Sequence, residues 1–322
     1  GPLSLVHSAV SGFGPDVVLV VGADVLDGSY NPILAMQMLV VADLAVRQGV
    51  LGSILGFSLA EHPSQYVAAV FDGLAPRLSI NVRDEISLSR FRRLSKAKAT
   101  LVADVAFLLK PDIASTRVRS IRHWASERRA QGNAVIGLNI HPMLMHIHSS
   151  DGIGALVGSA KKALAELMHC EGLSVVLISH DYRGDMGDDI CLEPIFRELH
   201  RDFGNKILYP VERLSAAELK GVAGSLDGIL TGRMHLAIAS LGMGVPVAAL
   251  TYQNKFEGLF RHFNLPDRFL LEPADAAKPE RLIELIGSFV RALSELRATV
   301  RPRLEGVRQA AEQNLQSLLA DT

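Results

Sequence analysis

The chain has 322 residues, 48% of them hydrophobic, which is enough for two domains of ordinary size with sizeable cores. Its 33 basic and 34 acidic residues nearly cancel, so no charge excess indicates a nucleic acid or an anionic membrane as partner. Only two cysteines occur, Cys170 and Cys191, which excludes a disulfide framework and favours reduced thiols in the cytoplasm. No apolar run approaches the length of a membrane span.

In the first part of the chain, apolar runs alternate with helical patterns. Val17–Val21 is a continuous β-branched and apolar run, typical of a strand buried on both faces. A composition shift over residues 110–116 indicates a domain edge. Before that edge, apolar spacing predicts helices over Pro32–Arg47, Ser64–Asp72 and Asp84–Leu94, and strands over Ser53–Phe57 and Leu78–Val82.

The alternation restarts after residue 134. Predicted strands cover Val135–Ile140, Ser174–Ser179, Lys206–Tyr209, Gly228–Leu230 and Val245–Leu250. Predicted helices cover Ile153–Met168, Glu193–His200, Ser215–Val222 and Phe256–Phe263, and the tail Leu282–Leu319 is mostly amphipathic helix, interrupted at Pro302.

Repeated strand–helix units predict parallel sheets covered by helices. We therefore expect an α/β fold with two Rossmann-like domains and a cleft between them. The expected domains are 1–115 and 116–300. The remaining residues, 301–322, form a C-terminal helix that packs back on the first domain or against a partner subunit.

The segment Gly232-Arg233-Met234-His235 lies between a predicted strand and a predicted helix, and Lys255 follows twenty residues later. A helix N-terminus carries unpaired N–H groups and partial positive charge, so it suits an anion. The Gly232–Met234 amides, Arg233, His235 and Lys255 together indicate a strongly anionic small ligand. Taken alone, each of these residues is more often structural than functional.

Other polar residues also follow predicted strands, where open parallel sheets bind ligands. They are Asp24, Asp27, Arg83, Glu85, His141, His180, Asp181 and Tyr252. Three loosely spaced histidines (141, 146 and 148) favour a polar loop over a metal site. The acidic run Asp185, Asp188 and Asp189 is misspaced for calcium and reads as a mobile loop or solvated surface.

The chain resembles the polysaccharide pyruvyl transferase family. The resemblance runs from about residue 16 to residue 265. Its matching parts include Val82-Arg83-Asp84-Glu85-Ile86-Ser87, Val176-Leu177-Ile178-Ser179-His180-Asp181, Gly232-Arg233-Met234-His235-Leu236, Gly244-Val245-Pro246-Val247 and Tyr252-Gln253-Asn254-Lys255. The Gly-Arg-x-His block with the downstream Lys255 is the most specific of them, and the Arg-Asp-Glu-x-Ser part is moderately specific. The Asn-x-Gly-Asp segment with which the family usually opens is absent from this sequence, and Gly22-Ala23-Asp24 replaces the usual glycine cluster.

The resemblance implies a two-domain, GT-B-like transferase that moves pyruvate from phosphoenolpyruvate onto a sugar as a cyclic ketal. It links His235 and Lys255 to donor binding and catalysis. We expect Gly232, Arg233, Met234, Arg83, His180, Tyr252 and Asp27 to bind substrate, and Asp24 and Glu85 to orient or deprotonate sugar hydroxyls. We expect neither a metal nor a cofactor, since Arg and Lys side chains can neutralise the donor.

The resemblance also implies partners: phosphoenolpyruvate as donor, and a glycan or lipid-linked oligosaccharide as acceptor, in the cytoplasm or at the inner face of the membrane. Peripheral membrane association and a homo-oligomer stay open. Two other functions also stay open. One is a GT-B glycosyltransferase that uses a nucleotide sugar, and the other is a non-catalytic glycan-binding protein of the same fold.

Overall fold

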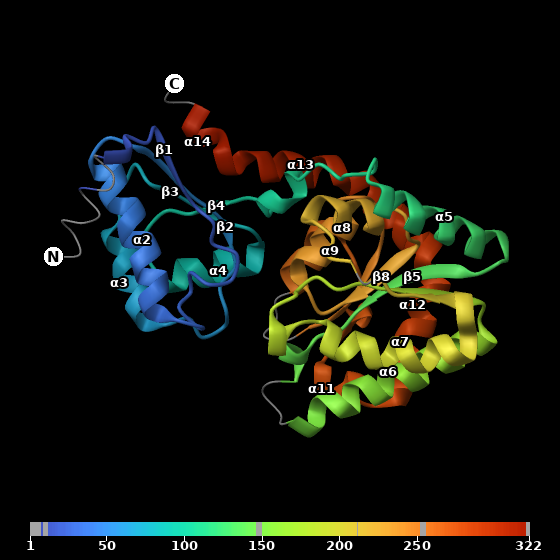
Figure 1. The fold of residues 1–322 in the computed structure, drawn as a ribbon. Coiled ribbons are helices and arrows are strands. Elements are labelled where there is room, and N and C mark those ends of the chain that lie inside the picture. The colour runs from blue at the N-terminus through green and yellow to red at the C-terminus, as the bar shows by residue number, and fades with distance from the viewer. Residues whose placement is uncertain (1–7, 9–11, 146–149, 211, 252–255, 320–322) are drawn as a thin grey trace. The chain divides into compact units, whose positions relative to one another are not determined.

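The structure is a computed structural model that describes residue 8 and residues 12–145, 150–210, 212–251 and 256–319. The chain divides into two compact units (Figure 1). The first unit comprises Gly1–Leu108, Gln253–His262 and Glu305–Thr322, and the second comprises Leu109–Tyr252 and Phe263–Leu304. The division after Leu108 lies close to the expected domain edge. The two later segments of the first unit come from regions that we had placed in the second domain and in the tail.

The first unit is built on a parallel sheet in the order β1-β2-β3-β4. The strands are β1 (Val17–Val20), β2 (Leu51–Phe57), β3 (Ser79–Val82) and β4 (Thr100–Leu101). The helices that connect them are α2 (Pro32–Arg47), α3 (Gln65–Gly73) and α4 (Glu85–Leu94). Because the pairing is parallel, the carboxyl ends of the strands meet at one edge of the sheet.

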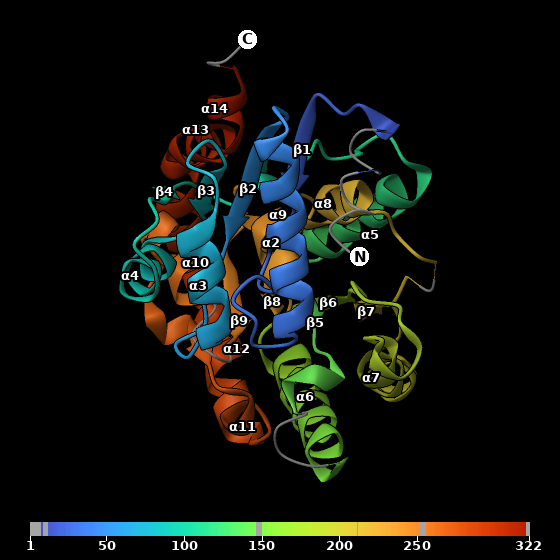
Figure 2. The ribbon, with the colours of Figure 1, turned by 90° about the vertical axis from the view of Figure 1, so that its left-hand side faces the viewer.

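The core of the first unit centres on three buried phenylalanines. Phe57 of β2 stacks on Phe71 of α3, with ring centroids 5.6 Å apart, and Phe91 of α4 meets both rings edge-on. These contacts hold α3 and α4 against the sheet, and α2 covers the same face (Figure 2). The 3₁₀ turn Gln313–Leu315, between α13 (Leu304–Glu312) and α14 (Gln316–Leu319), contacts β2.

The expected burial of Val17–Val21 on both faces is wrong. β1 is an edge strand of the sheet, and Val17, Leu19 and Val21 are exposed at 40%, 45% and 64%. Val20 alone is fully buried against α2, within the phenylalanine core. An apolar, β-branched run therefore predicted the strand correctly but not its place in the sheet.

The second unit contains a parallel sheet in the order β10-β9-β8-β5-β6-β7. The strands are β5 (Ala134–Asn139), β6 (Leu173–Leu177), β7 (Ile207–Leu208), β8 (Gly228–Thr231), β9 (Val247–Leu250) and β10 (Leu270–Leu271). Two Rossmann-like α/β units of this kind confirm the predicted fold class.

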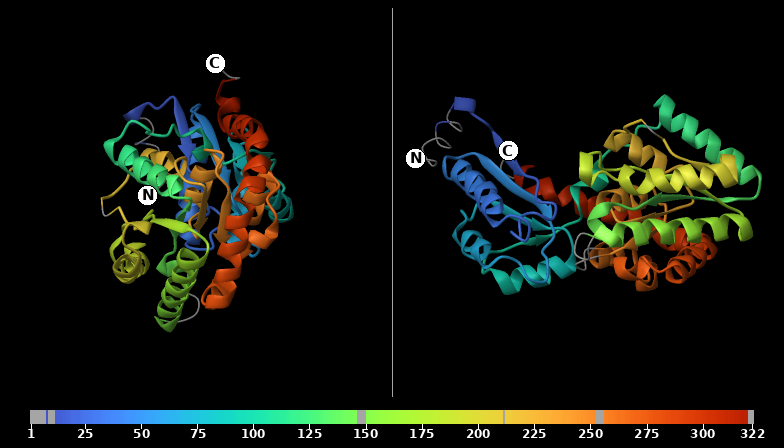
Figure 3. Two further views of the ribbon diagram at one scale, coloured as in Figure 1. Left: turned by 90° about the vertical axis from the view of Figure 1, so that its right-hand side faces the viewer. Right: turned by 60° about the horizontal axis from the view of Figure 1, so that its bottom comes forward.

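Helices cover both faces of the second sheet (Figure 3). One face carries α5 (Thr116–Ala130), α8 (Ala216–Ala223) and α9 (Met234–Leu241), whose apolar side chains share one core with β5 and β8. The other layer is formed by α6 (Ser150–Cys170), α7 (Asp189–Phe203) and α12 (Pro279–Val300). The short α11 (Pro273–Ala276) packs beside α6 and α12, and α10 (Phe256–Phe263) ends where the chain re-enters this unit.

The predicted break in the tail helix at Pro302 is confirmed. A 3₁₀ turn, Arg301–Arg303, separates α12 from α13, because proline cannot donate the hydrogen bond that a continuous helix needs. Within the described residues, no helix combines the length and the apolar character needed to cross a bilayer.

Candidate functional site

The polar site of the second unit lies at the carboxyl ends of β5, β6 and β8. Asn139 ends β5 and Thr231 ends β8, and both side chains are fully buried. The Thr231 hydroxyl donates to Asn139 Oδ1 at 3.0 Å and accepts from the Arg233 amide at 2.9 Å. These bonds fix the turn between β8 and α9, so the backbone at Arg233 is set by the strand ends themselves.

Arg233 forms an ion pair with Asp188, the residue before α7. Its Nη2 lies 2.6 Å and its Nε 3.1 Å from the same oxygen, Asp188 Oδ1. Asp188 is completely buried, and the Arg233 side chain is 13% exposed. Asp181 lies 3.3 Å from Arg233 Nη2 and also pairs with Arg183. Carboxylates therefore engage the Nε–Nη2 edge of Arg233 within the fold, and its predicted contact with an anion stays a prediction for the remaining Nη1 group.

Two histidines of this site are neutral at physiological pH. Burial, and then the positive charge of Arg233, lower the pKa of His141 from 6.5 to about 4. Burial, and then the nearby His235, lower the pKa of His180 to about 4. By contrast, hydrogen bonding from Arg183 holds the pKa of Asp181 at about 2, so this carboxylate stays ionised.

The predicted anion-binding loop is only partly available to a ligand. The Gly232 amide donates to Asn139 O at 3.2 Å, and the Arg233 amide is held by Thr231. Two of the three amides that the sequence assigned to an anion are thus used inside the fold. Met234 is the first residue of α9, where the N–H group has no partner within the helix, and the His235 side chain is exposed.

Gly232 has a steric role that the sequence did not reveal. A Cβ at this position would lie 2.8 Å from His141 Nε2 and 2.9 Å from the Leu144 side chain. Both neighbours are buried, so only glycine lets the β8–α9 turn approach the end of β5 this closely. Two residues predicted for this site, Tyr252 and Lys255, lie outside the described residues.

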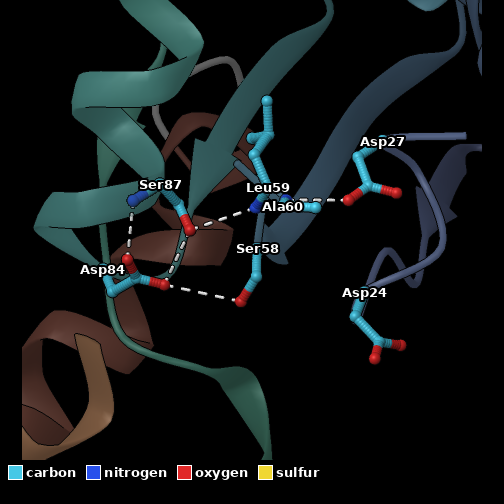
Figure 4. A pocket seen from close by; sticks show the side chains of 7 residues that line it. All are labelled: Asp24, Asp27, Ser58, Leu59, Ala60, Asp84 and Ser87. Carbon is cyan, nitrogen blue, oxygen red and sulfur yellow. Dashed lines mark hydrogen bonds between the residues drawn. The ribbon is translucent and has the colours of Figure 1, made fainter. Parts of the chain in front are cut away.

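A small acidic pocket occupies the corresponding edge of the first unit (Figure 4). It is lined by Asp24, Asp27, Ser58, Leu59, Ala60, Asp84 and Ser87. Asp27 is 2% exposed and accepts hydrogen bonds from the amides of Ser29 and Ala60, at 2.9 and 2.8 Å. Asp27 therefore braces the loop after β1 against the loop after β2. Asp24 is partly exposed, and the Tyr30 hydroxyl lies 3.4 Å from its carboxylate.

Arg83 is buried behind this pocket. Its Nη1 pairs with Asp104 at 2.8 Å, and its Nε donates to Ser58 Oγ. The Ser58 hydroxyl lies 3.4 Å from Asp84 Oδ2, which also accepts from Ser87 Oγ at 2.8 Å. Arg83 is 5% exposed and its guanidinium is held by Asp104 and Ser58, so its predicted contact with substrate stays a prediction.

In the loop after β3, the pocket is lined by Asp84 and not by its neighbour Glu85. Glu85, which we expected to act on sugar hydroxyls, is exposed and does not line the pocket. Asp84 lines it and caps α4 by accepting from the Ser87 amide at 2.7 Å. An Asp directly before the first residue of a predicted helix is a capping signal, and it could have indicated Asp84.

Asp188 and Asn139 are buried polar residues of this site that the sequence analysis did not identify. The acidic run around Asp188 had suggested a mobile loop or solvated surface, but Asp188 is completely buried. Asn139 could have been identified from the sequence as a polar residue at the end of an apolar strand, because open parallel sheets bind ligands there. Among the described residues, no group of three or more His, Cys, Asp or Glu side chains is arranged to hold a metal ion.

The two units define an α/β protein of the GT-B type, and solved structures share this fold. UDP-GlcNAc 2-epimerase from Neisseria meningitidis, solved with UDP-GlcNAc, matches with a TM-score of 0.64 at 14% identity, over 99% of this chain and 80% of the epimerase. A UDP-forming α,α-trehalose-phosphate synthase from Burkholderia xenovorans matches with a TM-score of 0.60 at 14% identity, over 99% and 76% of the two chains. UDP-GlcNAc 2-epimerase from Methanocaldococcus jannaschii matches with a TM-score of 0.55 at 15% identity, over 88% and 73%.

The family is shown by the sequence itself. The model of the polysaccharide pyruvyl transferase family matches residues 6–254, so the chain belongs to this family and is a transferase. The family description implies a small-molecule pyruvyl donor and a glycan acceptor. No curated protein matches the chain.

Proposed function

We propose that this protein transfers the pyruvyl group of phosphoenolpyruvate onto two hydroxyls of one sugar, forming a cyclic ketal and releasing phosphate. The sugar belongs to a polysaccharide or to a lipid-linked glycan precursor. Family membership over residues 6–254 supports the proposal, and one structural observation carries it. The histidines at positions 141, 180 and 235 and the guanidinium of Arg233 gather at the strand ends of the second unit.

The donor site we propose lies at the N-terminus of α9. Phosphoenolpyruvate carries about three negative charges near neutral pH, and it needs N–H donors and cations in a partly dehydrated pocket. The first amides of α9 and Arg233 Nη1 supply donors in the described residues, and Lys255 supplies the further positive charge that the family resemblance implies. An enol phosphate carries its own leaving group, so the proposed reaction needs no cofactor.

The chemistry requires one proton donor and two proton acceptors. Protonation of C3 makes C2 electrophilic, and the first sugar hydroxyl adds to C2 and loses its proton. The C2–O bond to phosphate then breaks, phosphate leaves, and the second hydroxyl adds to C2 and loses its proton to close the ketal. We assign C3 protonation or phosphate stabilisation to His235, because an imidazole can carry a proton near neutrality.

We assign recognition of an acceptor hydroxyl to the small pocket of the first unit. Carboxylates accept hydrogen bonds from sugar hydroxyls, and Asp24, Asp27 and Asp84 place three carboxylates around this pocket. Asp24 is the least buried of them and is our candidate for orienting or deprotonating a hydroxyl. Cys170 and Cys191 are free thiols, which agrees with action in the cytoplasm.

The test is to mix the protein with phosphoenolpyruvate and a broad panel of sugars and lipid-linked glycans. We expect phosphate release that depends on an acceptor, together with an acceptor product that carries a ketal. Absence of such release across the panel would contradict the proposal. Acceptor binding without phosphate release would favour a non-catalytic glycan-binding protein.

A nucleotide-sugar transferase is the competing enzyme, because the structural neighbours include proteins solved with UDP or UDP-GlcNAc. A ligand that binds only the folded state raises the melting temperature. Stabilisation by phosphoenolpyruvate and not by UDP-sugars supports pyruvyl transfer, and the reverse pattern supports the nucleotide-sugar enzyme.

A further inference from the structure

The Asp188 carboxylate connects three strand ends of the second unit. Its Oδ2 accepts from the His180 amide at 2.8 Å, from the Asp181 amide at 3.2 Å and from Asn139 Nδ2 at 2.7 Å. These donors come from the loop after β6 and from the end of β5. Its Oδ1 accepts from Arg233, in the turn after β8. A buried carboxylate is tolerated only when donors surround it, and Asp188 has five N–H donors.

The way Asp188 holds Arg233 leaves one side of the guanidinium group for a ligand. Both Nε and Nη2 donate to Asp188 Oδ1. Nη1 has a single contact within the described residues, the Met143 sulfur at 3.6 Å, and a thioether sulfur is a weak acceptor. The planar guanidinium is rigid, so fixing the Nε–Nη2 edge also fixes the direction of the Nη1 N–H bonds.

We propose that Asp188 is a positioning residue of the donor site: it grips the Nε–Nη2 edge of Arg233 and thereby aims Nη1 at the anionic donor. The proposal rests on the proposed function of this site. Asp188 acts through Arg233 and touches no substrate itself.

Asp181 is a weaker candidate for this role. Its carboxylate already receives three N–H donors from Arg183, the backbone amide, Nε and Nη2, and it meets Arg233 at the longer distance of 3.3 Å. Asp181 is also more exposed than Asp188, with 11% of its side chain accessible against 0%. Asp185, three positions before Asp188, is exposed and makes a matched control on the same loop.

The test is a double-mutant cycle between Asp188→Asn and Arg233→Lys. Lysine keeps the charge but has no fork for Asp188 to orient. With the natural arginine, we expect Asp188→Asn to lower kcat/KM for phosphoenolpyruvate by about 100-fold, as small misplacements of a binding group do. In the Arg233→Lys background, the same change should cost less than about 3-fold, because contacting residues couple. Asp185→Asn should leave kcat/KM unchanged.

The proposal is overturned if Asp188→Asn lowers kcat/KM by the same factor with Arg233 and with Lys at this position. A carboxylate with a purely structural role would have that equal effect in both proteins. If Asp188→Asn fails to fold, the test compares the affinity of Arg233→Lys and of Arg233→Gln for the donor. Similar losses of donor affinity in the two variants would show that the guanidinium geometry of Arg233 is needed, and not its charge alone. The proposal fails if Arg233→Lys binds the donor as tightly as the natural protein does.

Two measurements do not depend on turnover. Calorimetry with phosphoenolpyruvate and with inorganic phosphate should show about 10-fold or greater loss of affinity in Asp188→Asn. The ¹⁵N resonance of Arg233 Nε should lose its protection from solvent exchange in this variant and keep it in Asp185→Asn. The natural protein could show no turnover with any acceptor while Asp188→Asn loses both anion affinity and Nε protection. That result would support the positioning role of Asp188 and contradict the proposed reaction. An unchanged Nε resonance with unchanged anion affinity refutes the positioning role itself.

Discussion

Asn314 and Gly56 lie 258 positions apart in the chain, yet the Gly56 amide donates to Asn314 Oδ1 at 2.6 Å. The Asn314 side chain is completely buried and also donates to Ala103 O at 2.8 Å. Its backbone carbonyl accepts from Ser53 Oγ at 3.0 Å. One asparagine of the C-terminal segment thus supplies hydrogen-bond partners to β2 and to the loop after β4, so the tail is part of the first unit.

Replacing Asn314 with Ala should destabilise the first unit. The Gly56 amide and the Ala103 carbonyl would stay buried and lose their partner, at a cost of about 1–3 kcal/mol for each group. We expect a lower midpoint in urea-induced unfolding. Gln309→Ala, on the exposed side of α13, removes only a contact with Glu305 and should leave the midpoint unchanged. Equal midpoints for both variants would contradict the role assigned to Asn314.

Gly232→Ala should destabilise the second unit, because the new methyl group would overlap His141 and Leu144 in a packed interior. Overpacking of this kind costs about 1–3 kcal/mol and should lower the melting temperature. The control is Gly154→Ala in the second turn of α6, where the position is exposed and a Cβ would meet nothing within 4 Å. That change should stabilise the protein by about 0.5–1 kcal/mol. The prediction fails if the two substitutions shift the melting temperature in the same direction.

Asp104→Asn should be among the most destabilising single changes in the first unit. It leaves the guanidinium of Arg83 buried without its carboxylate, and breaking a buried pair costs about 3–5 kcal/mol. Glu193→Gln breaks an exposed pair with Arg197 and should cost less than about 1 kcal/mol. Chemical denaturation of both variants compares the two costs directly. A small loss for Asp104→Asn would show that water reaches Arg83.

The sequence predicted the boundaries of an element well where the spacing of its apolar residues matches the residues that are buried. The strand β2 and the helices α2 and α10 lie within two residues of their predicted ranges, because apolar spacing along each element reflects the core that it faces. The helix α5 was missed. Its fifteen residues are rich in arginine, and only Val118, Ile121 and Ala125 are buried, so its apolar stripe is too narrow to recognise.

The site was harder to predict than the fold, because its contacts join residues far apart in the chain. Arg233 was recognised, but Asp188 lies 45 positions away, and nothing local distinguishes it from its exposed neighbours Asp185 and Asp189. Burial of one acid among three depends on which strand ends meet, and that is a property of the sheet order. The same reason explains β1, whose apolar run could not reveal an edge position.

Acid should destabilise the second unit well before carboxylates titrate. His141 and His180 have folded-state pKa values of about 4, against an ordinary value of 6.5. Between these values the unfolded chain binds protons that the folded chain does not, so the free energy of unfolding falls as pH drops from 6.5 to 4. The slope approaches about 1.4 kcal/mol per pH unit for each histidine.

Urea unfolding at a series of pH values measures this slope. His180→Gln should reduce it by about half, because one of the two protons is removed. His123→Gln, at an exposed position, should leave it unchanged. Asp181 acts in a separate window, since its stabilisation is complete above pH 3.8 and is lost as pH falls to about 2. A free energy of unfolding that stays flat from pH 6.5 to 4.5 would contradict the assignment of both histidines as buried and neutral.

His235→Ala should reduce turnover far more than it reduces stability. His235 is exposed at the start of α9 and close enough to His180 to influence its charge, so its removal opens no core. Loss of a general acid or of phosphate stabilisation lowers kcat by about 10²–10⁴-fold.

Lys255→Ala should act mainly on the KM for phosphoenolpyruvate, because it removes a charge that binds the donor before reaction. His169→Ala, at an exposed position near the end of α6, is the matched control for a surface imidazole and should keep full activity. Acceptor-dependent phosphate release measures all three variants, and full activity in both His235→Ala and Lys255→Ala would place the donor elsewhere.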